Sequence, residues 1–219
     1  MTEVLLSRNQ VAVADAVTRS HLTTPTAFIV VKVDIGGASA YARAATRRLR
    51  TLVGLPEIAV KVLASLYPAF PAFFAGPAAS VAVTIDVGTG LYLPVVPEAD
   101  QIGMRDISRM LLNYRRSARH GTFRSAELSG GTIALTLSTD GPLYSRPIIF
   151  PGFVCAVSLG SMEQELYRDP HTGRISPRSV ILIGLSYDRR EVPTSSATCF
   201  VSALKSALES PAEQDVDFI

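Results

Sequence analysis

A group of polar side chains near the end of the chain could do chemistry. Its members are Tyr187, Asp188, Arg189, Arg190, Thr194, Ser195 and Ser196. An apolar run from Leu182 precedes them and predicts a strand, Pro193 predicts a turn, and the residues up to Glu209 have the spacing of an amphipathic helix. We therefore expect the group on a strand-to-helix corner, where side chains can project into a cleft.

Hydroxyl and guanidinium groups at such a corner can donate hydrogen bonds to an anion. We expect Tyr187, Thr194, Ser195 and Ser196 to contact a substrate. Arg189 has two interpretations: it faces the cleft as a fixed cation for a carboxylate, phosphate, enolate or oxyanion, or it turns to solvent or pairs with Glu191 or another subunit. In neither case is it a proton acceptor, because a guanidinium stays protonated at any working pH.

The length, composition and net charge of the chain exclude several classes of protein. The chain has 219 residues, of which 47% are hydrophobic and 18% charged, and this predicts a single globular domain over residues 1–219. The net charge of +2 is too small to indicate a nucleic acid or an anionic membrane as partner. No apolar run reaches the roughly 20 residues of a membrane-spanning helix, and the first 20 residues lack the pattern of a secretory signal.

The two cysteines bear on the redox compartment. Cys155 and Cys199 lie in apolar strand-like and helix-like contexts, and we expect both to be buried free thiols rather than a disulfide. Free thiols fit a reducing environment, so the predicted location is the cytoplasm. The abundance of alanine and arginine indicates a GC-rich bacterial genome.

Periodicity predicts the elements that would position the polar corner. Helical spacing covers residues 6–20, 38–52, 56–66 and 104–119, and strand-like runs cover residues 27–35, 80–87 and 132–138. Residues 168–176 read as a polar hairpin. The segment 67–76, rich in Pro and Phe, either packs as a wall of the core or lines an acyl pocket.

Five segments of this chain resemble five motifs of the dihydrolipoamide acyltransferases, the catalytic cores of 2-oxoacid dehydrogenase complexes, and they occur in the same order along the sequence. The last of them is SYDRREVPT, which stands where the family has S-Y-D-H-R-x-x-D-G. The PII of residues 147–149 matches the start of another motif, and the remaining matches are Val13, Ala14, Ser20, Pro25, Val33, Asp34, Val83, Gly90, Leu91, Pro94, Val95, Ala99, Asp100, Ile107, Gly130, Gly131 and Thr132.

The resemblance implies a fold and an assembly. The family shares the chloramphenicol acetyltransferase fold, so we expect an α/β sandwich in which helices pack on the face of a mixed sheet. We expect a stand-alone core without lipoyl or peripheral-subunit-binding domains. We expect this core to assemble as a homotrimer; the resemblance does not decide whether the trimers join into a larger cubic particle. The tail VDFI, residues 216–219, is similar to family C-termini that enter contacts between trimers.

The resemblance also implies roles for single residues. The family moves an acyl group between a lipoyl thioester and coenzyme A, using a histidine base and a hydroxyl from the neighbouring subunit that donates to the oxyanion. Thr136 falls at the hydroxyl position, and Arg189 stands at the histidine position. Pro193 and Gln10 replace a family Asp and Arg, while Asp188 and Arg190 fall at positions with structural roles. By spacing, none of His21, His120 and His171 replaces the missing base.

Two functions from different classes follow. The first is an acyltransferase-type enzyme that takes an acyl group from coenzyme A or a carrier protein to a small-molecule acceptor, in bacterial specialised metabolism, by a mechanism without the histidine. Its catalytic residues would be Arg189 and Thr136, with no permanently bound cofactor and no metal. The second is a non-catalytic trimeric scaffold or binding module. A different reaction in the same channel has no specific support in the sequence.

Overall fold

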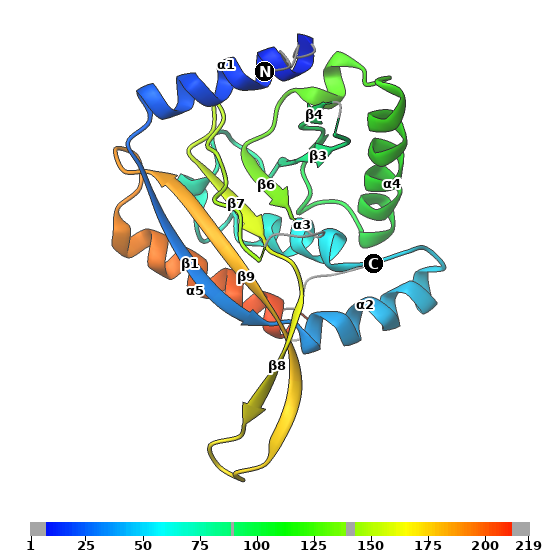
Figure 1. Ribbon diagram of the computed structural model, residues 1–219. Coiled ribbons are helices and arrows are strands. Elements are labelled where there is room, and N and C mark those ends of the chain that lie inside the picture. Colours follow the sequence, from blue (N-terminus) through cyan, green and yellow to red (C-terminus); the bar gives the residue numbers. More distant parts are fainter. Residues whose placement is uncertain (1–7, 89, 139–142, 212–219) are drawn as a thin grey trace, which may run out of the picture.

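Seven strands of a mixed β-sheet form the centre of the molecule (Figure 1), and the computed structural model describes residues 8–88, 90–138 and 143–211. The strands are β1 (Thr26–Asp34), β2 (Val81–Val83), β5 (Val95–Val96), β6 (Ile133–Leu137), β7 (Cys155–Leu159), β8 (Glu163–Arg168) and β9 (Ile175–Asp188). Their order is β1-β9-β7-β6-β2-β5, with β8 paired to β9 outside this path. The pairs β7–β6 and β6–β2 are parallel, and the other pairs are antiparallel.

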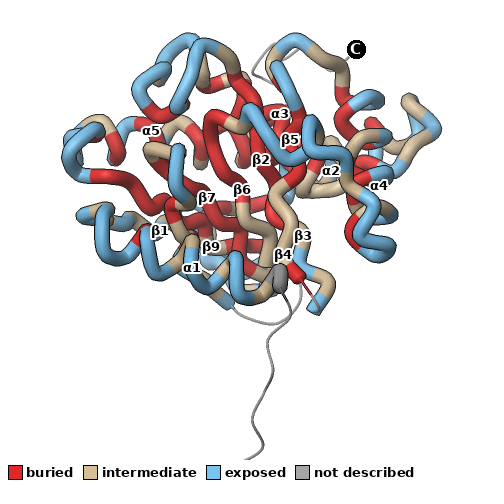
Figure 2. The backbone as a smooth tube through the Cα atoms, turned by 90° about the horizontal axis from the view of Figure 1, so that it is seen from above, coloured by how far each residue is buried: buried red, intermediate tan, exposed pale blue. Residues whose placement is uncertain are grey.

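Helices cover both sides of this sheet. They are α1 (Arg8–Thr23), α2 (Gly36–Leu49), α3 (Leu55–Ser65), α4 (Met104–His120) and α5 (Thr194–Glu209), with short 3-10 turns at Pro71–Phe73 and Ser125–Leu128. Figure 2 shows α3 and α5 on one side of the buried sheet and α1 on the other. A separate two-stranded hairpin, β3 (Ile85–Asp86) and β4 (Leu91–Tyr92), lies beside the end of β6 on the side of α1.

The two faces of the sheet differ in character because side chains alternate along each strand. On β9, Ile183, Leu185 and Tyr187 belong to the main core, which also contains residues of α3 and α5. Within that core the rings of Phe73 and Phe200 stack with their centroids 4.1 Å apart. The opposite face carries small and hydroxyl side chains instead, and the candidate site forms there.

This architecture confirms the predicted fold class, a mixed sheet with helices packed against it. The element boundaries needed small corrections. The helix expected over residues 38–52 begins at Gly36 and ends at Leu49, because Arg50 adopts a left-handed conformation with φ of 50°. The last strand begins at Ile175, seven residues before the apolar run, since its first half pairs with β8 in an arm that extends from the body (Figure 1).

One prediction about the cysteines was wrong. Cys155 is buried, but Cys199 is exposed, and both are free. Cys199 lies on α5 beside the exposed Thr198, on the helix face that points away from the core, whereas Ala197 and Phe200 are buried. No helix in the described part of the chain is long and apolar enough to cross a membrane. The tail at residues 216–219 lies outside the described residues.

The segment 67–76 packs as part of the core. Phe73 and Phe74 are buried, and the Tyr67 and Phe74 rings meet edge to face at 5.1 Å. Packing in the core therefore accounts for the apolar residues of this segment. None of the residues that line the cavities described below comes from it.

Candidate functional site

The polar corner at the end of β9 is held by an ion pair. Arg190 donates to both carboxylate oxygens of Asp188, with Nη2···Oδ2 at 2.5 Å and Nε···Oδ1 at 3.0 Å, and its backbone N–H donates to Oδ1 at 2.9 Å. These bonds hold the pKa of the Asp188 carboxyl below its usual value, although burial of the group opposes the shift. The pair fixes the turn that leads into α5.

Arg189 lies between the two paired residues and is exposed. Its backbone N–H donates to the carbonyl of Pro25 at 3.2 Å, which fixes the main chain at this point. The described residues provide no ion-pair partner for its side chain, and Glu191 forms none with it. Arg189 is therefore a surface cation of the isolated chain.

The four expected substrate contacts divide into two groups. Tyr187 is only 2% exposed and packs in the core, where its hydroxyl donates to Thr194 Oγ1 at 3.1 Å. This corrects the expectation for its side chain, which positions the start of α5 and does not reach the surface. Thr194 and Ser195 are exposed and Ser196 is partly exposed, all in the first turn of α5.

Thr136 lies in a cavity elsewhere on the sheet. It is on β6, on the face opposite the core, because its neighbours Leu135 and Leu137 pack into the core. The cavity has a volume of about 210 Å³. It is lined by Thr84, Asp86, Leu91, Thr136, Leu137, Ser138, Ser145, Arg146, Pro147, Ile148 and Phe150. This set provides hydroxyls, two opposite charges and an apolar wall.

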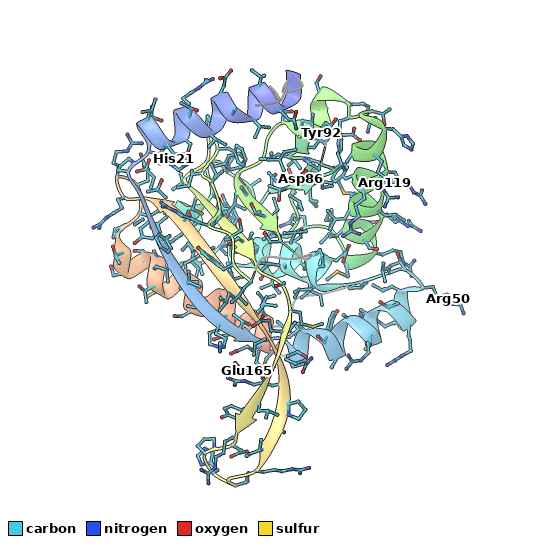
Figure 3. All side chains as sticks on the ribbon, in the orientation of Figure 1. His21, Arg50, Asp86, Tyr92, Arg119 and Glu165 are labelled. Carbon is cyan, nitrogen blue, oxygen red and sulfur yellow. The ribbon has the colours of Figure 1, made fainter. Side chains whose placement is uncertain are left out.

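Asp86 and Arg146 are residues of this cavity that sequence reasoning missed. Asp86 follows β2 in alternation with Thr84, so both face away from the core while Ile85 packs against it. Figure 3 shows Asp86 on β3, at the end of the molecule where α1 lies. Arg146 immediately precedes the PII motif, and its guanidinium lies 4.9 Å from the centre of the Phe28 ring. The alternation of residues 84 and 86 was the only sequence signal for either residue.

Thr136 and Arg189 do not meet within one chain. In the sheet register, Thr136 of β6 is paired with Ser158 of β7, and Ser158 is paired with Gly184 of β9. Arg189 lies five residues beyond Gly184, so two strand spacings and five residue rises place the two Cα atoms roughly 20 Å apart. A site that uses both side chains needs a second copy of the chain.

Buried hydroxyls continue from Thr136 across the sheet. Ser158, Ser186 and Tyr144 each have a hydroxyl oxygen without a hydrogen-bond partner among the described residues. They surround Gly184, where a Cβ would lie 2.6 Å from the Tyr144 ring and 2.7 Å from Ser158 Oγ. Gly184 thus lets Tyr144 pack onto the sheet, and Tyr144 precedes the two residues that form one wall of the cavity.

A second cavity adjoins the first. It has a volume of about 240 Å³ and shares Arg146, Pro147 and Ile148 with the Thr136 cavity. His21 lines it from the last turn of α1 (Figure 3), together with Ser20, Thr26 and Ile149. The described lining of the Thr136 cavity contains no histidine, and His120 and His171 are exposed on other elements. In the described part of the chain, no cluster of His, Cys, Asp and Glu could hold a metal ion.

Comparison with known proteins agrees with this fold. A dihydrolipoamide acetyltransferase of Azotobacter vinelandii, studied for the roles of a serine, a histidine and an asparagine in its catalytic mechanism, superposes with a TM-score of 0.89. It is 19% identical and covers 97% of this chain and 93% of its own. A chloramphenicol acetyltransferase superposes with a TM-score of 0.52 over 89% of this chain and 94% of its own, at 12% identity.

The sheet, its helical layers and these superpositions define a chloramphenicol acetyltransferase-like fold. The sequence model of one protein family, the 2-oxoacid dehydrogenases acyltransferase (catalytic domain), matches residues 1–214 of the chain. The chain therefore belongs to this family. A curated relative, the dihydrolipoyllysine-residue succinyltransferase component of the 2-oxoglutarate dehydrogenase complex of Rickettsia bellii, is 33% identical over 132 residues. That match covers 60% of this chain and 32% of the relative, so it spans about a third of the relative's length.

Proposed function

We propose that the chain transfers an acyl group from coenzyme A, or from a carrier-protein thioester, to a small-molecule acceptor without a histidine base. The observation that carries this proposal is the Thr136 hydroxyl, which lines a cavity of about 210 Å³ in a chain of the acyltransferase family. A hydroxyl placed beside the acyl carbonyl can donate to the oxyanion of a tetrahedral intermediate. Neither a metal nor a bound cofactor is part of this mechanism.

The proposal includes self-association, with a homotrimer as the expected state. Arg189 of one copy would enter the Thr136 cavity of the next and polarise the acyl carbonyl. The separation of Thr136 and Arg189 within one chain supports this arrangement, and so does the exposure of Arg189. The first-turn hydroxyls of Thr194, Ser195 and Ser196 would contact substrate beside it, while Asp188 and Arg190 hold the turn.

The acceptor must ionise without the family's base. A positioned base contributes about 10²–10⁴ in rate, so an acceptor that is already nucleophilic near neutral pH is favoured. Bacterial specialised metabolism is the proposed setting, and the composition rich in alanine and arginine is its support. The proposed location is the cytoplasm.

The test is thiol release from acetyl-, propionyl- and succinyl-coenzyme A in the presence of dihydrolipoamide and small amines, hydroxyl compounds and amino acids. We expect Thr136→Ala to lower kcat by about 10²-fold, as loss of one oxyanion donor does. Arg174→Ala, a change in the exposed hairpin, is the matched control and should leave turnover unchanged.

Two results would decide against the proposal. If the folded protein released no thiol above the rate without enzyme, acyl transfer would be excluded for these donors and a trimeric scaffold would be favoured. If turnover were unchanged by Arg189→Ala, Arg189 would have no part in the mechanism.

A further inference from the structure

The Thr136 cavity contains two opposite charges that do not neutralise each other. Asp86 and Arg146 both line it, yet the described residues form no ion pair between them. Asp86 Oδ1 accepts a hydrogen bond from the Gly88 N–H at 2.7 Å, which leaves Oδ2 able to accept another. Arg146 Nη2 makes one long hydrogen bond, 3.4 Å, to the carbonyl of Thr26. Each group therefore keeps hydrogen-bonding capacity for a ligand.

The strand order places these charges on opposite walls. Asp86 continues from β2, which lies on one side of β6, whereas Arg146 stacks on Phe28 of β1, at the far edge on the other side of β6. Thr136 on β6 lies between them. A line across the cavity thus meets a carboxylate, a hydroxyl and a guanidinium in that order.

Arg146 is held in place for this role. Its guanidinium packs over the Phe28 ring, a cation–π contact that restricts a long side chain. The segment behind it is anchored by Tyr144, which packs closely onto Gly184. The remaining wall is apolar, formed by Leu91, Leu137, Pro147, Ile148 and Phe150.

We propose that this cavity binds a small aminocarboxylate, with the ligand's ammonium group at Asp86, its carboxylate at Arg146 and its backbone beside Thr136. A volume of about 210 Å³ accommodates an amino acid of modest size. The inference goes beyond the proposed function, because it concerns a ligand of the cavity and not the acyl acceptor: an ammonium group held at Asp86 has no free electron pair with which to attack an acyl carbonyl. Binding of the ligand does not depend on turnover, so the two can be tested separately.

Calorimetric titration of the full chain with L-alanine, β-alanine and γ-aminobutyrate tests the proposal. Propionate and ethylamine are matched probes that each lack one charge. We expect one of the three aminocarboxylates to bind at least about tenfold more tightly than either probe, because removing one charge-assisted hydrogen bond lowers affinity about tenfold. The best of the three also reports the distance between the two charged walls.

Two variants assign the charges to the ligand's ends. Asp86→Asn keeps the oxygen that accepts from Gly88 but removes the negative charge, so it should erase the preference for the aminocarboxylate over propionate. Arg146→Gln should erase the preference over ethylamine. Asp100→Asn and Arg174→Gln, outside the cavity, should change neither preference, and circular dichroism checks that every variant is folded.

Three outcomes separate the possibilities. If none of the three aminocarboxylates bound the wild-type protein more tightly than propionate and ethylamine do, or if none of these compounds bound, the aminocarboxylate site would be overturned whatever the acyltransferase assay shows. Preferences that survive both cavity variants would also overturn it. Aminocarboxylate binding in a protein that releases no thiol would support the site and remove only the acyltransferase function.

Discussion

Asp188 and Arg190 form a bidentate ion pair on either side of Arg189, the residue that the sequence resemblance places at the family's histidine position. The carboxylate is 7% exposed and the guanidinium is 59% exposed, so the pair lies at the boundary between core and solvent. Arg189 between them is exposed, and it has no ion-pair partner among the described residues. The turn before α5 is thus fixed by this ion pair, and the exposed residue within it is a cation.

The first prediction concerns the stability of this turn. Asp188→Asn should lower the free energy of unfolding by about 1–3 kcal/mol at pH 7, because it removes a charged acceptor of several hydrogen bonds at a buried position. The folded-state pKa of Asp188 lies below its unfolded value, so this contribution is present above about pH 4 and is lost as the pH falls through the folded pKa. Urea unfolding of both proteins from pH 7 to pH 3 measures the difference, which should shrink below pH 4. A constant difference over that range would contradict the assignment.

The second prediction concerns Gly184. Gly184→Ala should destabilise the fold by about 1–3 kcal/mol, because its Cβ would overlap the Tyr144 ring and Ser158 Oγ. The same displacement should move the Ser145–Arg146 wall and weaken ligand binding in the cavity. Urea unfolding gives the first effect and calorimetry the second.

A double-variant background provides the control for Gly184. Tyr144→Ala together with Ser158→Ala removes the overlapping atoms, so adding Gly184→Ala to that background should cost less than adding it to the wild-type protein. An equal cost in both backgrounds would show that the packing around Gly184 is not the cause.

The third prediction concerns the thiols. In the native protein, Ellman's reagent should modify Cys199 and leave Cys155 unmodified, since Cys199 is exposed whereas Cys155 is buried with its thiol donating to the Phe73 carbonyl at 3.3 Å. Burial also raises the pKa of the Cys155 thiol and so suppresses the reactive thiolate. Cys199→Ser should abolish the native reaction, and unfolding should release one further thiol. Reaction of both thiols in the folded state would contradict this placement.

The elements of the fold could be predicted from the sequence, because their periods are strong. The helix at residues 104–119 and the helix after Pro193 were placed to within a residue or two. Errors came from local conformation and from pairing, as at Arg50 and at the start of β9. The exposure of Cys199 was missed because apolar neighbours on a helix do not fix which face a single position occupies.

The composition of the cavity could not be predicted. Thr136 was found because its motif continues through Gly130, Gly131 and Thr132. Asp86 lies in a stretch that lacks the family's residues, and Arg146 stands just outside a matched motif. About 50 to 60 residues separate Asp86 from the other two positions in the chain, and only the parallel β2–β6–β7 arrangement brings their segments together.

The last prediction concerns the shared site. If Thr136 of one copy and Arg189 of another form one site, mixing Thr136→Ala and Arg189→Ala subunits should recover activity that neither variant has alone. Random assembly of equal amounts into trimers leaves about a quarter of the sites with both residues intact, because each site draws one residue from each of two adjacent copies. Co-expression with two different affinity tags isolates the hybrids, and thiol release from the acyl donor gives their turnover. Tagged hybrids of wild-type and Arg174→Ala subunits serve as the control and should keep full activity. Hybrids no more active than the parent variants would show that Thr136 and Arg189 do not act in one site. A monomeric protein in analytical ultracentrifugation would also exclude the shared site, because that site needs two copies of the chain.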